Sequence, residues 1–311
     1  MTTRMREVYS DTLIRLAEKD RNIVVLEADL MAAHATKSFM EKFPERTFNV
    51  GVAEANMVGI ACGLSARGKI PFAGSFAPFV TRRAYDQFFV SANYAKLNVK
   101  LMGSDPGITA AYNGGTHMPF EDVGIMRNVP GLIIYEPADG VSLQKLLTES
   151  AYRKGNVYLR LHRGNAPGIY NQNDEIKLGK ANVLKDGNDV TLIASGVVMV
   201  NEALKASEML QKEGVSAAVI DMHTIKPLDE EIVLKYAAKT SRIVTCENHQ
   251  VMNGLGSAVA EVLSEKQPIL MKRIGVNDEF GEVGDIEYLK ERFGLTAKRI
   301  CESARSLLVT A

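Results

Sequence analysis

The strongest constraint on the fold of this chain is the alternation of short β-branched runs with helix-like segments. In the first half, strands are predicted at residues 22–29, 69–75, 98–105, 131–137 and 156–164, and helices at 3–19, 53–67, 78–94, 121–128 and 139–153. Parallel strands need crossover segments of this kind. The alternation therefore predicts an α/β fold with a mostly parallel sheet.

A polar stretch of turn formers and charged residues, 166–189, interrupts this rhythm, and a second series begins after it. Further strands are predicted at residues 189–196, 215–222, 241–248 and 268–276, with helices near 197–213, 229–239, 254–265 and 285–309. We therefore expect two α/β domains, at 1–168 and 189–311, joined by a linker at 169–188.

Charge and composition limit the kinds of partner that this protein is expected to bind and the cellular compartment in which it is expected. Lys plus Arg and Asp plus Glu both number 37, so no broad basic field is expected to hold nucleic acid or an anionic membrane. The three cysteines are far apart and lack metal-ligand spacing, which fits a reducing cytoplasm. The first 20 residues predict an amphipathic helix, not a signal peptide, and no apolar run is long enough to span a membrane. Small molecules or proteins are the expected partners.

The candidate site residues follow from the rule that open α/β sheets bind ligands at the carboxyl ends of their strands. The loop at 103–122 is rich in glycine and offers backbone amides and one imidazole, His117, which could serve catalysis or only tie its loop to a neighbour. Arg160 and Arg163 could bind a phosphate or carboxylate, or form salt bridges. Phe76 and Phe79 could form an aromatic wall or pack in the core.

The stretch "GVAEANMVGIACGLSARG" carries its only acid, Glu54, at the start of a predicted helix. Its many Gly and Ala residues suit a helix packed closely against another backbone. A carboxylate in the first turn interacts favourably with the helix dipole, and this alone could account for Glu54.

Several ordered motifs together resemble the transketolase family. The stretch "NVGVAEANMVGIACGLSARGKIPFAGSFAPFVTRRAYDQ", with "NGGTHMPFED" and "VYLRLHRGN", is similar to the transketolase pyrimidine-binding domain, and "DVTLIASGVVMVNEALKASEMLQKEG", "RIVTCENH" and "GLGSAVAEVL" are similar to its C-terminal domain. The Gly-Asp-Gly…Asn motif, with which transketolases hold Mg²⁺ and diphosphate, does not occur here; "KDGND" lacks the first glycine. The chain thus resembles the C-terminal subunit of a split transketolase.

The resemblance implies a role for each matching residue. Glu54 would hydrogen-bond N1′ of the aminopyrimidine of thiamine diphosphate, and Phe76 and Phe79 would stack against that ring. His117 would exchange protons with substrate oxygens. Arg163 would grip the sugar phosphate, and Arg4, expected in the first helix, would match a second arginine.

The sequence departs from the family pattern at three substrate positions. Asn113 stands where many transketolases have aspartate, Ser104 replaces a histidine usual near the phosphate, and Ala33 replaces a common serine. These departures predict an unusual donor ketose, such as a branched-sugar phosphate or a sulfonated sugar, in place of pentose phosphates.

The resemblance also implies an assembly. An N-terminal transketolase subunit would hold the diphosphate and Mg²⁺, no metal ligand being expected in this chain, and two copies of each chain would form a heterotetramer. The helix of Glu54 would lie on the partner-facing surface.

Three alternatives remain open at this point. They are the β subunit of a 2-oxo acid dehydrogenase, an enzyme like deoxyxylulose-phosphate synthase, and a non-catalytic regulatory subunit. "GGTHMPFED" and Arg163 favour transketolase over the first, and Glu54 with its aromatic neighbours disfavours the last. In the second half, "GLGS" is a weak nucleotide signal, and His223, Glu247 and His249 are expected to be structural or interfacial.

Overall fold

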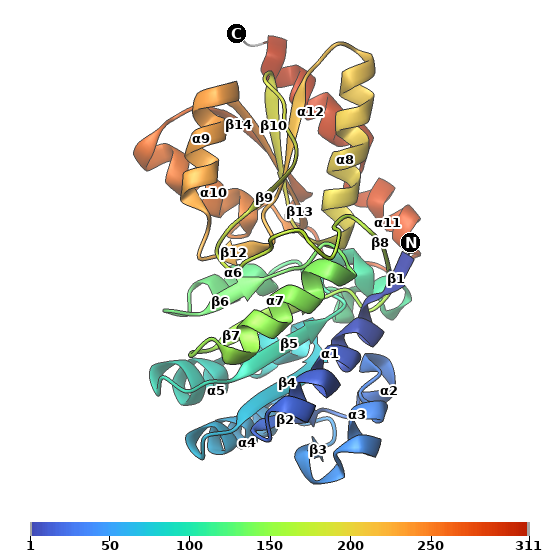
Figure 1. Ribbon diagram of the computed structural model, residues 1–311. Helices are drawn as coiled ribbons and strands as arrows, with labels where there is room; N and C mark the ends of the chain where they lie inside the picture. The colour runs from blue at the N-terminus through green and yellow to red at the C-terminus, as the bar shows by residue number, and fades with distance from the viewer. Residues whose placement is uncertain (1, 310–311) are drawn as a thin grey trace.

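The chain forms two stacked α/β domains in the computed structural model, which describes residues 2–309 (Figure 1). The first contains a seven-stranded sheet in the order β12-β6-β7-β5-β4-β2-β3, parallel except for β12. Its strands are β2 (Ile23–Glu27), β3 (Thr47–Asn49), β4 (Ile70–Phe76), β5 (Lys100–Ser104), β6 (Ile133–Tyr135), β7 (Val157–Leu161) and β12 (Thr224–Lys226). This arrangement confirms the predicted fold class.

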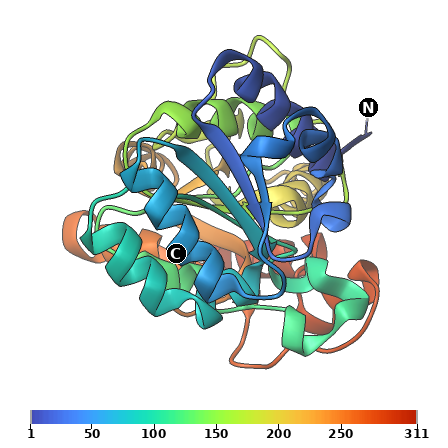
Figure 2. The same cartoon turned by 90° about the horizontal axis from the view of Figure 1, so that it is seen from below.

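Helices cover both faces of this sheet (Figure 2), which explains why its strands are apolar without alternation. In β2, Ile23 and Val25 pack toward one cluster of helices, and Val24 and Leu26 toward the other. The helices are α1 (Met5–Lys19), α2 (Met31–His34), α3 (Lys37–Lys42), α4 (Glu54–Ala66), α5 (Tyr85–Gln87), α6 (Asp122–Arg127) and α7 (Gly140–Tyr152).

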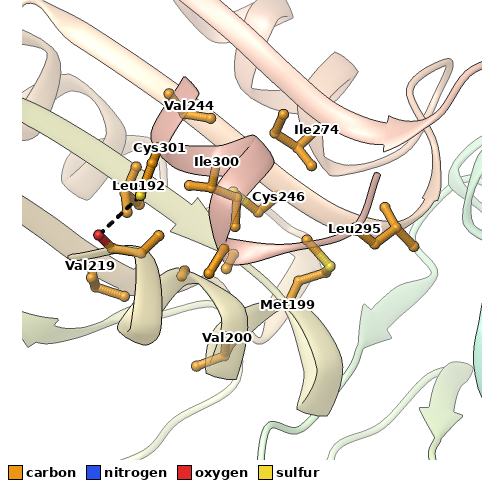
Figure 3. Packing of buried hydrophobic residues seen from close by; sticks show 14 of the residues in the cluster. Leu192, Met199, Val200, Val219, Val244, Cys246, Ile274, Leu295, Ile300 and Cys301 are labelled. Atoms are coloured by element: carbon orange, nitrogen blue, oxygen red, sulfur yellow. Dashed lines mark hydrogen bonds between the residues drawn. The ribbon is translucent and has the colours of Figure 1, made fainter. Parts of the chain in front are cut away.

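The second domain has a five-stranded sheet in the order β14-β13-β10-β11-β9, with β9 antiparallel to its neighbour. Its strands are β9 (Asn182–Lys185), β10 (Val190–Ala194), β11 (Ala217–Asp221), β13 (Arg242–Gln250) and β14 (Leu270–Val276), and its helices are α8 (Gly196–Lys212), α9 (Glu230–Thr240), α10 (Leu255–Lys266), α11 (Ile286–Phe293) and α12 (Ala297–Val309). One core fills the space between α8, α12 and the sheet (Figure 3). Cys246 and Cys301 are both buried in it.

The structure corrects several local expectations. Arg4 lies outside the first helix, in β1 (Thr2–Arg4), because its extended backbone pairs with Asn165 of β8 (Asn165–Pro167). The predicted helix at 285–309 is two helices, because Gly294 takes a left-handed φ of 68° and ends α11. The helix at 78–94 contains π-helical turns at Phe79–Arg83 and Phe88–Tyr94. The segment expected to be a linker contains β9.

A buried carboxylate helps to join the two domains. Asp221 ends β11 and accepts a hydrogen bond of 2.7 Å from the Tyr170 hydroxyl to one oxygen, Oδ2. Its other oxygen, Oδ1, is buried without a hydrogen-bond partner among residues 2–309. Burial raises the pKa of Asp221 from 3.8 to about 8, opposed by the Tyr170 hydrogen bond. The folded protein therefore holds a proton that the unfolded chain releases near pH 4.

We predict that Asp221→Asn removes a pH dependence of stability. Between about pH 4 and 8 the wild-type folded state binds more protons than its unfolded state, so its free energy of unfolding should fall, relative to that of the variant, as the pH rises through this range. Urea unfolding of both proteins at several pH values measures the difference. Parallel curves for the two proteins would contradict the assignment.

Candidate active site

Glu54 is a buried carboxylate at the first residue of α4, with 1% of its surface exposed. The Ser75 hydroxyl, on β4, donates to Oε1 at 2.8 Å, and the Arg83 guanidinium donates to Oε2 at 2.6 Å. The Arg83 side chain is 46% exposed, so it can move aside when a ligand supplies another donor to the buried carboxylate. Glu54 thus has one fixed partner and one that a ligand can replace.

Three half-buried rings gather beside this carboxylate. The centre of the His117 ring lies 5.4 Å from that of Phe76 and 5.0 Å from that of Phe79, and the two phenylalanine rings are 6.1 Å apart. All three contacts are edge to face, an arrangement that aromatic quadrupoles favour. The Arg83 guanidinium lies 4.2 Å from the Phe79 ring centre and connects the rings to Glu54.

Arg163 also lies against these rings. Its guanidinium carbon is 5.0 Å from the centre of the Phe76 ring, and its Nε is paired with the buried carboxylate of Asp105. Burial raises the pKa of Asp105, although the neighbouring Arg163 acts against this shift. The structure therefore brings Glu54, Phe76, Phe79, His117 and Arg163 into one cluster.

Two other candidates have exposed side chains that do not join this cluster in the structure. The Arg4 side chain is 49% exposed and donates to Glu7 at 3.2 Å, although the backbone next to it contacts Gly164. Asn113 is exposed at the end of a 3₁₀ segment, Gly107–Asn113, in the loop that carries His117.

Ser104 is fully buried and faces away from solvent. Its hydroxyl lies 2.9 Å from His34 Nε2, while His34 Nδ1 lies 2.7 Å from Glu27. The Thr36 hydroxyl donates to the other oxygen of Glu27 at 2.7 Å. This chain of buried hydrogen bonds gives Ser104 a partner inside the protein. Sequence reasoning missed His34, whose only signal was its position shortly after a strand that ends in an acid.

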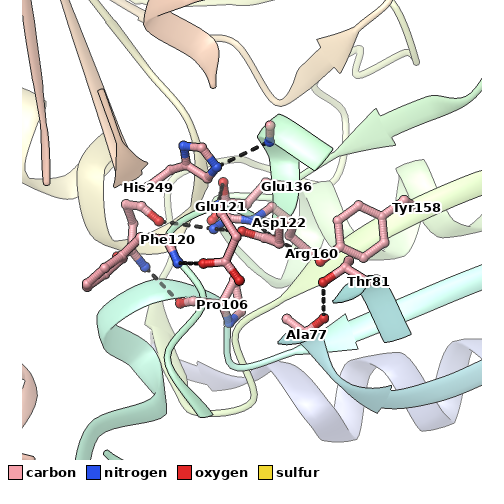
Figure 4. A network of polar contacts seen from close by, with 12 residues as sticks. Ala77, Thr81, Pro106, Phe120, Glu121, Asp122, Glu136, Tyr158, Arg160 and His249 are labelled. Carbon is pink, nitrogen blue, oxygen red and sulfur yellow. Dashed lines mark hydrogen bonds and ion pairs between the residues drawn. The ribbon is translucent and has the colours of Figure 1, made fainter. Parts of the chain in front are cut away.

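The remaining polar candidates have structural partners. The Arg160 guanidinium is buried between Asp122 and Glu136, with nitrogen–oxygen distances of 2.7 Å to each carboxylate (Figure 4). Glu247 accepts hydrogen bonds from the amides of Leu255 and Gly256, so its carboxylate occupies the start of α10 at the "GLGS" motif.

The two second-domain histidines are also held within the protein. His223 contacts Thr224 and Asn182. His249 accepts from the Gly124 amide, and burial lowers its pKa to about 4. Both rings therefore serve packing between structural elements.

Residues 2–309 contain no group of three or more His, Cys, Asp or Glu side chains placed to hold a metal ion. No helix in this described part of the chain has the length and apolar character needed to cross a membrane.

Comparison with known proteins decides the family. The family model for the transketolase pyrimidine-binding domain matches residues 1–168, and that for the transketolase C-terminal domain matches residues 179–300. The chain belongs to the transketolase family. The family resemblance found in the sequence is thereby confirmed, and thiamine diphosphate is the cofactor of this family.

Similar proteins include subunits of split enzymes. The chain is 53% identical to the 6-deoxy-6-sulfo-D-fructose transketolase subunit of Clostridium sp. (strain MSTE9), over 97% of this chain and 94% of that relative. It matches the structure of a split gene transketolase, an inactive beta4 tetramer, with a TM-score of 0.90 and 41% identity over 98% of both chains. Human transketolase is 34% identical, over 98% of this chain but 49% of the human protein.

We predict that Ser104→Ala lowers stability without weakening substrate binding. The change leaves buried His34 Nε2 without its partner, which should cost about 1–3 kcal/mol in the free energy of unfolding. Chemical denaturation measures this cost, and the KM for a ketose in a complete transketolase that contains this chain should stay unchanged. Arg163→Met, which removes the cation beside the rings, provides a positive control for a raised KM. A similar rise for Ser104→Ala would show that the serine contacts substrate.

Proposed function

We propose that this chain is the C-terminal subunit of a split, thiamine-diphosphate-dependent transketolase that transfers a two-carbon ketol unit from a ketose to an aldose. The observation that carries the proposal is the buried Glu54 carboxylate beside the half-buried Phe76, Phe79 and His117 rings. Family membership makes this cluster the natural place for the cofactor's pyrimidine and the substrate.

The residues in the cluster fit an aminopyrimidine. A protonated ring nitrogen can donate to the Glu54 oxygen that Arg83 now contacts, and burial strengthens such a hydrogen bond. The part-exposed rings of Phe76 and Phe79 offer apolar surface to a flat heterocycle. When bound, thiamine diphosphate supplies the electron sink that carbon–carbon bond cleavage needs.

The chain's other residues would handle the sugar. His117 Nδ1 lies 2.9 Å from the Thr116 hydroxyl, which orients its ring, and its half-buried position suits proton exchange with substrate oxygens. Arg163 can bind an anionic group at the end of the sugar through its forked donors. These roles agree with the positions of both side chains, which lie 5.4 Å (His117 ring) and 5.0 Å (Arg163 guanidinium carbon) from the centre of the Phe76 ring.

The proposal includes a partner subunit. The 311 residues contain no Gly-Asp-Gly…Asn motif, and the matched part of human transketolase is about half of its length. An N-terminal subunit would supply the diphosphate and Mg²⁺ sites, in a heterotetramer with two copies of each chain. Val52 and Tyr112, near Glu54 and His117 in sequence, are 70% and 72% exposed, which suits burial against such a partner. We also place this complex in the cytoplasm, where its three free cysteines would stay reduced.

For the donor we propose a ketose with a sulfonate at its end. The relative that is 53% identical is, by its name, a subunit of a 6-deoxy-6-sulfo-D-fructose transketolase. Within this chain, Asp105 offsets part of the Arg163 charge, and Ser104 stands in place of a histidine and is bonded to His34. A weakened cationic site suits a sulfonate monoanion better than a phosphate dianion.

A ketol-transfer assay tests the proposal. The chain is combined with a candidate N-terminal subunit, thiamine diphosphate and Mg²⁺, and is offered 6-deoxy-6-sulfo-D-fructose, fructose 6-phosphate and xylulose 5-phosphate. Activity is expected only in the mixture, with the sulfonated ketose turned over fastest. A rate far higher for xylulose 5-phosphate would contradict the proposed donor.

We further predict that Glu54→Gln lowers kcat in the assembled enzyme by roughly 10²-fold or more, because a preorganised carboxylate at the reacting group is lost. Glu202→Gln is the matched control, since Glu202 is a buried carboxylate of the second domain that is bonded to Lys290 and the Ala297 amide. It should leave kcat unchanged. Full activity of Glu54→Gln would favour a regulatory subunit, and decarboxylation of a 2-oxo acid would favour a dehydrogenase β subunit.

A further inference from the structure

The loop that carries His117 packs into the core of the second domain, although it belongs to the first domain in sequence. Ile108, Ala110, Met118 and Phe120 are all buried in the same cluster as the side chains of α8, α12 and the second sheet. The Phe120 ring lies 5.2 Å from that of Phe293, at the end of α11. The second domain therefore determines where this loop sits.

One side chain of the second domain holds the start of the loop. Asn248, in β13, is 2% exposed and bonds to both sides of Gly107: its Nδ2 donates to the Pro106 carbonyl at 2.9 Å, and its Oδ1 accepts from the Ile108 amide at 2.9 Å. A Cβ atom on Gly107 would lie only 2.2 Å from Asn248 Oδ1. The amide group and the glycine thus fit each other closely.

The end of the loop is held by the same strand. The Gln250 amide donates to the Phe120 carbonyl at 2.9 Å, and the Gly107 amide donates to the Pro119 carbonyl at 3.0 Å, which closes the loop at its base. The backbone of Asn248 is itself fixed, because its carbonyl accepts from the buried Arg160 guanidinium at 3.0 Å. The two ends of the loop are therefore held by Asn248 and Gln250, which are two positions apart in β13.

We infer that Asn248 is a positioning residue for the reaction: it fixes the loop so that His117 stays against Phe76 and Phe79. Thr116 is exposed and His117 is half-buried, and both lie at the tip of the loop. The tip of the loop is therefore less well packed than its base. The consequence for catalysis rests on the proposed role of His117. The effect of Asn248 on the order of the loop does not depend on that role. The effect on the loop and the effect on catalysis are therefore measured separately.

Asn248→Ala tests the inference, with Asn156→Ala as its matched control. Asn156 is also buried and bonds in the same two ways, donating to the Ala92 carbonyl at 2.9 Å and accepting from the Val99 amide at 2.8 Å. It lies just before β7, whereas the candidate site lies beyond the carboxyl ends of these strands. Each variant loses one donated and one accepted hydrogen bond to the backbone. Only Asn248→Ala removes bonds to the loop that carries His117.

The first readout is hydrogen exchange of the isolated chain, which needs neither partner nor substrate. Asn248→Ala should speed exchange of the amides in 107–121 by about tenfold or more, the factor expected when a buried hydrogen bond is lost, and should leave those of α4 unchanged. Asn156→Ala should affect the segment near residues 88–99 instead. Unchanged exchange in 107–121, or equal loosening in both variants, would overturn the inference.

The second readout is kinetic and uses the assembled enzyme. Asn248→Ala should lower kcat by about tenfold with an unchanged affinity for thiamine diphosphate, because Glu54, Phe76 and Phe79 lie outside the loop, while Asn156→Ala should keep kcat within about twofold of wild type. An unchanged kcat for Asn248→Ala would overturn its role in the reaction. If Asn248→Ala does not fold, Asn248→Asp, which keeps the acceptor for the Ile108 amide, replaces it with the same expected direction of both effects.

Discussion

The buried Arg160 guanidinium is the interaction on which the arrangement around the site depends. Its charge is balanced by Asp122 and Glu136, and Tyr158 also donates to Asp122 at 2.7 Å. These groups join the ends of β6 and β7 to the start of α6, and the Asn248 carbonyl connects them to the second domain. Removing the guanidinium would leave two carboxyl groups in the interior without their shared cation, so the four segments are held together as a unit. The loop of His117 begins and ends within this unit.

The sequence predicts the long, buried strands and their crossover helices because apolar runs of five or more residues carry a strong local signal. It does not predict β1, β3, β8 and β12, which are three residues each and form only because a partner strand is already in place. Gly294 in the left-handed region breaks a helix whose apolar pattern continues on both sides. In these cases tertiary context outweighs local preference.

The site shows the same division between local and distant signals. Motifs in the sequence identified Glu54, Phe76, Phe79, His117 and Arg163, and these residues lie together. The motifs could not show that the Ser104 hydroxyl turns inward, because its partner His34 is 70 positions away. Nor could they reveal Asn248, whose bonds to the loop span about 140 positions. Roles that depend on such distant pairs become visible only in three dimensions.

The exchange of segments between the domains limits where a gene for such an enzyme can be divided. β12, from the second half, completes the first sheet beside β6, while Ile108 and Met118, from the first half, complete the second core. Division between these two domains would leave each product with an open sheet edge or an unfilled core. Division ahead of the first domain leaves the cores of both domains complete, and the half-buried rings beside Glu54 then lie at the surface of the chain. Under the proposed function, a division at that point keeps both hydrophobic cores in one chain, and a second polypeptide supplies the missing part of the active site.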